Sequence, residues 1–437
     1  METDLIAEFT FKNNYKSLPQ PVKERTRLAV LNFIAVTIGA NRYSQTSSLI
    51  NTSVKIQQGD LPIFGSGKKA GLIGSVWANS ALSHYLDFDD THLETIVHPS
   101  APVIPSSILI GISNCDSGET AIYSSAIGME VSLRLALSVG LDERYSDWHN
   151  TSLYGTSASA IASAIMMKGT QEQLSQSMLE GLSVATGFLS NRGTETKSFQ
   201  VGRSAAEGVV SAMAVLNGIR ASKNMLNTFS KSLSGNSKLE LLTEDFGTKW
   251  HVLNNFLKPY PCGVVLHPAI DAAIELRSQN LTLEKIEEIN VFVNPVVMVL
   301  TAILEPKSGL EGKFSITHTV AAALVYGSLM PEHFSDDCVN NPEVVKIRSR
   351  VRVYQKEDVN RGQTVIEIKY YDGRVESAEV NRGPSKPSKL LDESDVRKKY
   401  MGLTIPVLGE EKANDIWTYF SKLDRAKDLS EVKEIFN

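Results

Sequence analysis

The spacing of apolar residues changes twice along this chain, and these two changes constrain its fold more than any single motif. From Pro21 onward the apolar residues recur at helical spacing. From Leu283 they alternate as in half-buried strands, and the pair Asp372-Gly373 is typical of a hairpin turn. Helical spacing returns after Asp392. We therefore predict a mainly α protein with an α+β part, in which a large all-helical domain is interrupted by a smaller α+β domain. The predicted boundaries are residues 1–255 and 392–437 for the helical domain and 256–391 for the α+β domain.

Composition excludes several classes of protein. The 437 residues are 42% apolar and 21% charged, as in ordinary globular proteins. A net charge of −5 gives no general attraction to nucleic acid or to anionic membranes, so neither is an expected partner. The first residues lack a signal-peptide pattern and no apolar run approaches eighteen residues, which predicts a cytoplasmic protein. The three cysteines form no C-x-x-C pair, which argues against an iron–sulfur cluster, a structural zinc and a disulfide framework.

The stretch from residue 81 to residue 101 concentrates titratable side chains among apolar ones. Its polar members include His84, Asp87, Asp89, Asp90, Thr91, His92 and His98. Burying such groups without partners is costly, so the pattern indicates one wall of an active site. The alternative is the polar end of a helix followed by a turn. Aspartate and histidine also bind metals, but no H-E-x-x-H or EF-hand spacing is present, and we predict no metal site.

Two further segments offer charge to a ligand. His149 precedes a helix rich in small residues, and amide groups at a helix start favour an anion, so this is a candidate carboxylate pocket. The alternative is a surface histidine near a helix cap. Lys197 is predicted to lie in a Gly-rich loop, Asn191 to Gly208, that joins two buried helices.

A lysine between aromatic and proline residues forms the last candidate. Pro259 and Pro261 stiffen the backbone around Lys258 and would hold its side chain in one direction. Cys262 and His267 follow and suggest a nucleophile with its base. Because no surrounding signature supports that pair, a packed thiol is the favoured interpretation of Cys262.

These motifs together resemble the MmgE/PrpD family, which includes 2-methylcitrate dehydratase, cis-aconitate decarboxylase and iminodisuccinate epimerase. The resemblance covers most of the chain. It rests on HYLDFDDTH with HPSA, on the Gly-Thr-x-Thr-Lys segment, on KPYPCG with a following His, and on KFS, at residues 84–92, 98–101, 193–197, 258–267 and 313–315. The family implies a helical domain plus a lid, a site between them, no metal or organic cofactor, and a homodimer.

The resemblance also implies roles for individual residues. His98, His149, Asp87 and Lys258 are the implied catalytic residues, and Thr91, Lys197 and His318 the implied substrate-binding residues. His318, in a predicted helix from Phe314 to Gly327, stands where cis-aconitate decarboxylases have a tyrosine. Dehydratases of the family typically read DFNDT and HPSDN, whereas this chain has Asp89 and Ala101.

All three family reactions handle charge next to a carboxylate. Two fixed lysines would stabilise the negative charge that builds up, histidines would move the proton, and Asp87 could orient an imidazole. We expect a cofactor-independent lyase, a decarboxylase or dehydratase, acting on a small di- or tricarboxylate. The alternatives are an epimerase of an iminodisuccinate-like dicarboxylate and a non-catalytic binding protein on the same fold.

Overall fold

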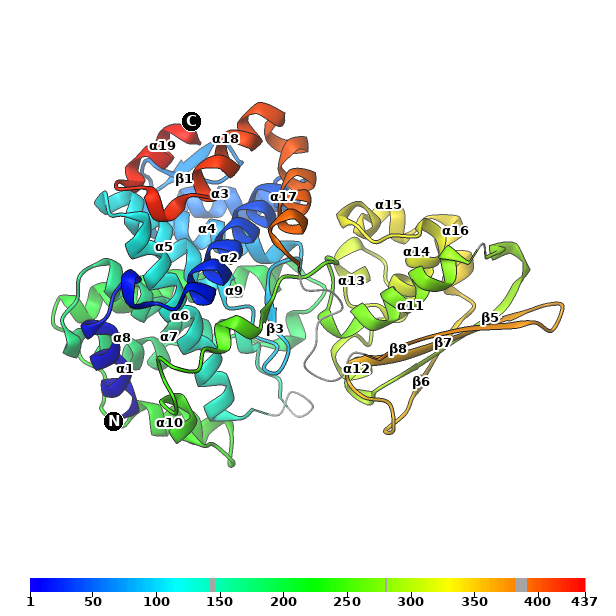
Figure 1. The fold of residues 1–437 in the computed structure, drawn as a ribbon, viewed down its shortest axis with the longest axis horizontal. Helices are drawn as coiled ribbons and strands as arrows, with labels where there is room; N and C mark the ends of the chain where they lie inside the picture. The colour runs from blue at the N-terminus through cyan, green and yellow to red at the C-terminus, as the bar shows by residue number, and fades with distance from the viewer. Residues whose placement is uncertain (142–145, 280, 382–390, 437) are drawn as a thin grey trace.

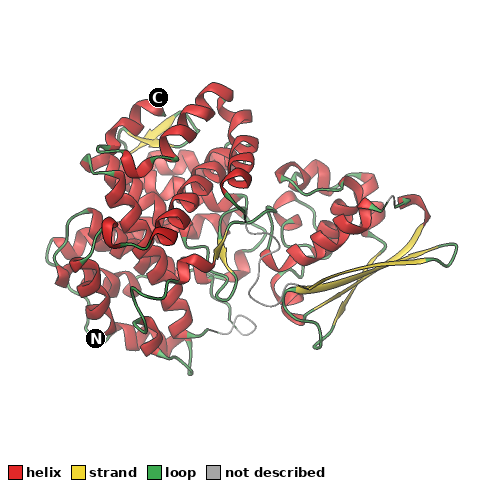
Figure 2. Cartoon of the chain, viewed as in Figure 1, coloured by secondary structure: helices red, strands yellow, loops and turns green. Residues whose placement is uncertain are grey.

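The computed structural model describes residues 1–141, 146–279, 281–381 and 391–436, and its two parts lie side by side (Figure 1). One part is built of helices and contains both chain ends; the other carries a four-stranded sheet with helices on one face (Figure 2). The predicted mainly α fold with an α+β part is therefore confirmed. No helix in the described ranges is long and apolar enough to cross a membrane.

The helical part takes its elements from both ends of the chain. Its helices are α1 (Glu2–Lys12), α2 (Gln20–Ala40), α3 (Thr46–Ile56), α4 (Leu72–Tyr85), α5 (Ser100–Asn114), α6 (Gly118–Val139), α7 (Asn150–Met166), α8 (Gln171–Ser183), α9 (Glu195–Leu216), α10 (Met225–Leu233), α17 (Glu393–Leu408), α18 (Glu410–Phe420) and α19 (Val432–Ile435). Two antiparallel pairs of very short strands accompany them: β1 (Leu61–Ile63) with β2 (Lys68–Ala70), and β3 (Thr91–His92) with β4 (Asn255–Phe256).

Small residues let the central helices approach closely. A Cβ atom on Gly155 of α7 would meet Pro102, and one on Gly208 of α9 would meet Ser159 of α7. A Cβ on Gly202 would come within 2.5 Å of the Trp77 carbonyl oxygen of α4. Because glycine permits this contact, α9 packs along α4 and runs as one helix from Glu195. The predicted loop up to Gly208 is therefore wrong, since Lys197 lies in the first turn of α9.

The helices of the α+β part pack on one face of its sheet. The strand order is β6-β5-β7-β8, with β5 and β6 parallel and the other pairs antiparallel. Its elements are α11 (His267–Ser278), β5 (Ile286–Val293), α12 (Pro295–Leu300), α13 (Gly309–Gly312), α14 (Ile316–Tyr326), α15 (Asp336–Val339), α16 (Pro342–Arg348), β6 (Val351–Gln355), β7 (Gln363–Tyr370) and β8 (Val375–Asn381). Side chains of β7 alternate between buried and partly exposed, and α11 packs on the buried face. The predicted hairpin turn is confirmed, with Gly373 at φ +84°.

Each part has its own apolar core. One core cluster runs from Ile6 to Leu257 and resumes at Leu391, while the other runs from Cys262 to Val380. The return helix α17 packs on α2 and so completes the first core. We retain boundaries at 255/256 and 391/392 as our proposal for the two domains.

Candidate active site

The centre of the site is the turn that follows α4. The helix ends at Tyr85, and Asp87 has φ +51°, a left-handed conformation that reverses the chain. The chain then forms β3, which pairs antiparallel with β4, so that Thr91 faces Phe256. This short pairing places Lys258, two residues beyond Phe256, next to Asp87.

Asp87 lies between two lysines. Its Oδ1 is 2.6 Å from Nζ of Lys197 and its Oδ2 is 3.0 Å from Nζ of Lys258. All three side chains are buried. Burial alone would raise the pKa of Asp87, but the two ammonium groups hold that pKa well below its usual value. Burial in turn lowers the pKa of Lys197. The site thus contains one carboxylate and two cationic groups at its wall.

The imidazoles are oriented by Asp89, whereas Asp87 contacts the lysines. His84 donates from Nδ1 to Oδ2 of Asp89 over 2.7 Å, and Nε2 of His84 accepts from Nζ of Lys197 over 2.7 Å. Nδ1 of His98 lies 3.3 Å from Oδ1 of Asp89 and 3.1 Å from Oγ1 of Thr91. Burial, opposed by Asp89, lowers the pKa of His84 to about 4 and also lowers that of His98. The expectation that Asp87 orients an imidazole is corrected accordingly.

His149 reaches the site from the first residue ahead of α7. Its backbone N–H donates to the Gly187 carbonyl over 3.0 Å, which fixes the chain at this point. Nδ1 of its ring lies 2.9 Å from the amide nitrogen of Gln200 and 3.1 Å from Oγ of Ser152. His149 is 5% exposed, so it is not a surface capping residue. No motif or spacing in the sequence distinguishes Gln200 from other polar residues.

The backbone carbonyls of the turn accept hydrogen bonds from three lysines. We call residues 85–88 the carbonyl turn. Lys313 donates to Tyr85 O over 3.3 Å, Lys258 to Asp87 O over 3.0 Å, and Lys399 to Phe88 O over 2.7 Å. Lys399 also donates to the carbonyl of Lys258 over 2.9 Å. Lys258 and Lys313 belong to the α+β part and Lys399 to α17, so the turn joins three separate segments.

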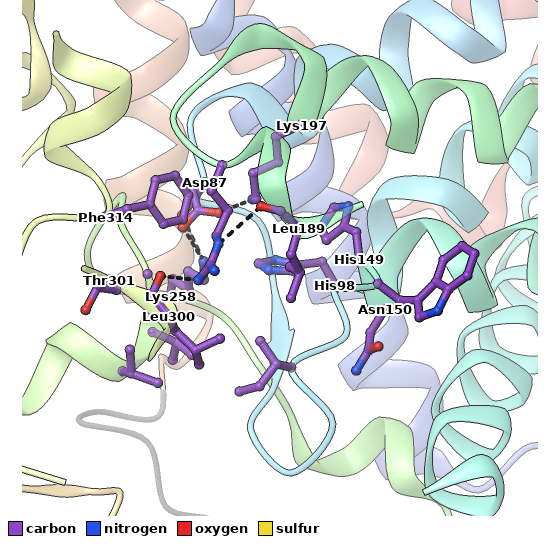
Figure 3. Close-up of a pocket in the computed structure, with 16 residues that line it drawn as sticks. Asp87, His98, His149, Asn150, Leu189, Lys197, Lys258, Leu300, Thr301 and Phe314 are labelled. Atoms are coloured by element: carbon purple, nitrogen blue, oxygen red, sulfur yellow. Dashed lines mark hydrogen bonds and ion pairs between the residues drawn. The ribbon is translucent and has the colours of Figure 1, made fainter. Parts of the chain in front are cut away.

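A pocket opens beside this group and is lined from both parts of the molecule (Figure 3). Its polar members include Asp87, His98, His149, Asn150, Lys197 and Lys258. Its apolar members are Ile96, Trp148, Leu189, Val264, Val265, Leu300 and Phe314. A small cluster of charge at one end and an apolar wall elsewhere is the usual composition of a site for a small organic ligand.

Two predicted substrate-binding residues lie away from the pocket lining. Thr91 is buried behind His98 and contacts its ring. His318 is on α14, in the predicted helix, but its Nε2 bonds the His333 carbonyl over 2.9 Å and its ring packs on Phe334. We therefore leave His318 out of the substrate site proposed below. Cys262 is fully buried and burial raises its thiol pKa well above the usual value, which favours the packed thiol.

Only one group among the described residues has the geometry of a metal-ligand set. His84, Asp89 and His98 offer ligand atoms within 4.8 Å of one another. Both ring nitrogens of His84 already have partners, one of them the ammonium of Lys197. A cation would have to displace the bond between His84 and Asp89 and lie close to a positive charge. These residues therefore fit a hydrogen-bonded network better than a metal site.

The two-part division of the chain is also that of a known protein family. The MmgE/PrpD N-terminal domain matches residues 4–241 and the MmgE/PrpD C-terminal domain matches residues 260–425, so the chain belongs to the MmgE/PrpD family. Its curated relatives include a cis-aconitate decarboxylase of Aspergillus terreus, 25% identical over 96% of this chain and 92% of the relative. The cis-aconitate decarboxylases of Mus musculus and Homo sapiens are 24% and 22% identical, each over 82% of this chain and over 76% and 77% of the relative.

Proposed function

We propose that this protein is a lyase that decarboxylates or dehydrates a small di- or tricarboxylate without a metal or an organic cofactor. The observation that carries the proposal is the pair of ammonium groups on Lys197 and Lys258, held by Asp87 in a pocket that also contains His98 and His149. The names of the relatives favour decarboxylation over dehydration.

The chemistry follows from charge and proton balance. Loss of CO2 from R–COO⁻ leaves a carbanion beside a remaining carboxylate, and one proton converts it to R–H. Lys197 and Lys258 can turn from Asp87 toward the substrate carboxylates and stabilise this charge most strongly in the transition state. His98 is the proposed proton carrier, because Asp89 beside its Nδ1 stabilises the imidazolium form.

The test combines product analysis with proton exchange. The full chain is incubated with a panel of di- and tricarboxylates in D2O, and the reaction is followed by NMR. We expect loss of CO2 and a carbon-bound deuterium in the product, and we expect His98→Ala to abolish both. Turnover and deuterium incorporation that survive in His98→Ala would remove His98 from the mechanism.

The same experiment separates the remaining alternatives. A new double bond without CO2 would indicate a dehydratase, and scrambled stereochemistry would indicate an isomerase of the iminodisuccinate epimerase type. Binding of an acid without any chemical change would indicate a binding protein and contradict the proposal. The family resemblance also leads us to propose a homodimer, which light scattering on the purified chain measures.

A further inference from the structure

The side-chain amide of Gln200 has a defined orientation. The backbone N–H of Phe188 donates to Oε1 of Gln200 over 3.0 Å, and Nδ2 of Asn191 donates to the same oxygen over 3.3 Å. The amide nitrogen of Gln200 donates to the Phe188 carbonyl over 3.1 Å. A backbone N–H needs an acceptor and a carbonyl needs a donor, so rotating the amide by half a turn would oppose like groups at both positions. The nitrogen of Gln200 is therefore the atom that faces His149.

This orientation determines which ring nitrogen of His149 carries hydrogen. The amide nitrogen of Gln200 only donates, so Nδ1 of His149, 2.9 Å away, must accept with its lone pair. The Ser152 hydroxyl, 3.1 Å from the same atom, can donate to it as well. A neutral imidazole that accepts at Nδ1 carries its hydrogen on Nε2, the remaining ring nitrogen of a residue that lines the pocket.

Protonation of His149 is opposed from two sides. An imidazolium has N–H groups on both nitrogens, and the one on Nδ1 would point at the donor of Gln200. Burial, followed by the positive charge of Lys197 and the rings of His84 and His98, lowers the pKa of His149 well below its usual value. Asp87 acts in the opposite direction but does not reverse the shift. His149 is therefore neutral at physiological pH.

His98 has the opposite arrangement. Its Nδ1 lies 3.3 Å from the carboxylate of Asp89, which only accepts, and hydrogen-bonds the Thr91 hydroxyl, which can accept, so Nδ1 carries hydrogen and Nε2 holds a lone pair. The two histidines therefore present different groups to the pocket. Nε2 of His149 presents a hydrogen-bond donor, and Nε2 of His98 presents a site that can take up and release a proton.

We propose that Gln200 is a positioning residue that keeps His149 neutral with its hydrogen on Nε2, so that His149 donates a hydrogen bond to the substrate anion while His98 moves the proton. The roles given to His149 and His98 in the reaction rest on the proposed function, whereas the protonation state of the His149 ring does not. A neutral imidazole can stabilise an enediolate oxygen as an electrophile without transferring its proton.

The state of the ring is measured directly by NMR on full-length protein labelled with ¹⁵N-histidine. Only eight histidines are present, and the His149→Gln variant identifies the His149 signals by their loss. We expect long-range ¹H–¹⁵N correlations to show Nδ1 unprotonated and Nε2 protonated, with no titration between about pH 8 and about pH 5.5. In Gln200→Glu the new carboxylate needs a donor, so the Nδ1 proton should appear. Gln45→Glu, a matched change at an exposed position, should leave every histidine signal unchanged.

Activity separates the two histidine roles. A glutamine amide can place an N–H near the position of Nε2 but cannot carry a proton, so His149→Gln should retain at least about tenfold more turnover than His149→Leu. His98→Gln should show no such advantage over His98→Leu. In Gln200→Glu the pH profile of turnover should gain a second titrating group.

Two results would overturn the proposal. The first is a proton on Nδ1 of His149 in the wild-type protein, and the second is titration of His149 between about pH 6 and about pH 8. Both are read without substrate, so they decide the proposal even if no acid is turned over. Absence of turnover with the expected ring state would contradict the proposed function alone.

Discussion

Replacing Lys258 by methionine should reduce both the stability of the fold and the activity. A lysine that only faced substrate would contribute little to folding, but Lys258 is 1% exposed and its ammonium is bound within the protein. It pairs with the Asp87 carboxylate at 3.0 Å and donates to the Asp87 and Cys262 carbonyls over 3.0 and 3.1 Å. Methionine keeps the length of the side chain and removes all three interactions.

The expected loss of stability in Lys258→Met follows from the contacts that Asp87 keeps. Breaking a buried ion pair by removing one partner typically costs about 3–5 kcal/mol. Asp87 keeps Lys197 at 2.6 Å, so its charge is still half compensated and the lower end, about 3 kcal/mol, applies. Turnover should fall by about 10²–10³, as when one transition-state donor is removed.

Urea unfolding followed by circular dichroism measures the stability change, and steady-state kinetics measures the activity. The matched control is Lys68→Met, an exposed lysine whose ammonium group bonds Asn51, with an expected change within about 0.5 kcal/mol. A double-mutant cycle with Asp87→Asn isolates the pair itself. A Lys258→Met protein within about 1 kcal/mol of wild type would refute the ion-pair reasoning.

Two further predictions concern metal and pH. Turnover should survive exhaustive chelation, because both ring nitrogens of His84 already have hydrogen-bond partners and one partner is the ammonium group of Lys197. Loss of turnover that a divalent ion restores would show that His84, Asp89 and His98 bind a metal. His267 is buried between aromatic rings, and burial lowers its pKa to about 3. The unfolded chain takes up a proton on His267 below about pH 6.5 and the folded chain does not, so the free energy of unfolding should fall as the pH falls from about 6.5 toward 3. In urea titrations, His267→Phe should remove up to about 1.4 kcal/mol per pH unit of that loss. An unchanged dependence of stability on pH in this variant would contradict the lowered pKa of His267.

Periodicity was sufficient to predict the order of the two parts, because their apolar patterns differ in period. Periodicity was not sufficient to predict helix boundaries near glycine residues, as α9 shows. Gly202 reads as a loop signal in the sequence, but in the structure it lets the helix approach the backbone of Trp77. That contact depends on α4, which lies more than a hundred residues earlier and cannot be seen in a local pattern.

Asp87 and His98 were predictable because titratable residues cluster around them in sequence, and Lys258 because Pro259 and Pro261 follow it. The residues that hold these charged groups in place were not predictable from the sequence. Lys399 lies in a run of basic residues beside Lys398; the structure exposes one and buries the other against the Phe88 carbonyl. Gln200 is one amide on a long helix, and only its contact with His149 distinguishes it. Which aspartate faces an imidazole depends on the left-handed turn at Asp87, a property that side-chain chemistry does not reveal.

The carbonyl turn has a consequence for the order in which this protein can mature. Its three lysine donors follow the turn residues that they bind by 171, 228 and 311 positions in the chain. On the ribosome, the turn is therefore synthesised long before Lys399 emerges, and its Phe88 carbonyl waits for a donor until most of the chain has been made. Contacts this distant in sequence are slow to form, since the closure of long loops precedes any gain from them. We expect the helices from α1 to α10 to collapse early, and the active site to be among the last regions to become ordered because it waits for α17.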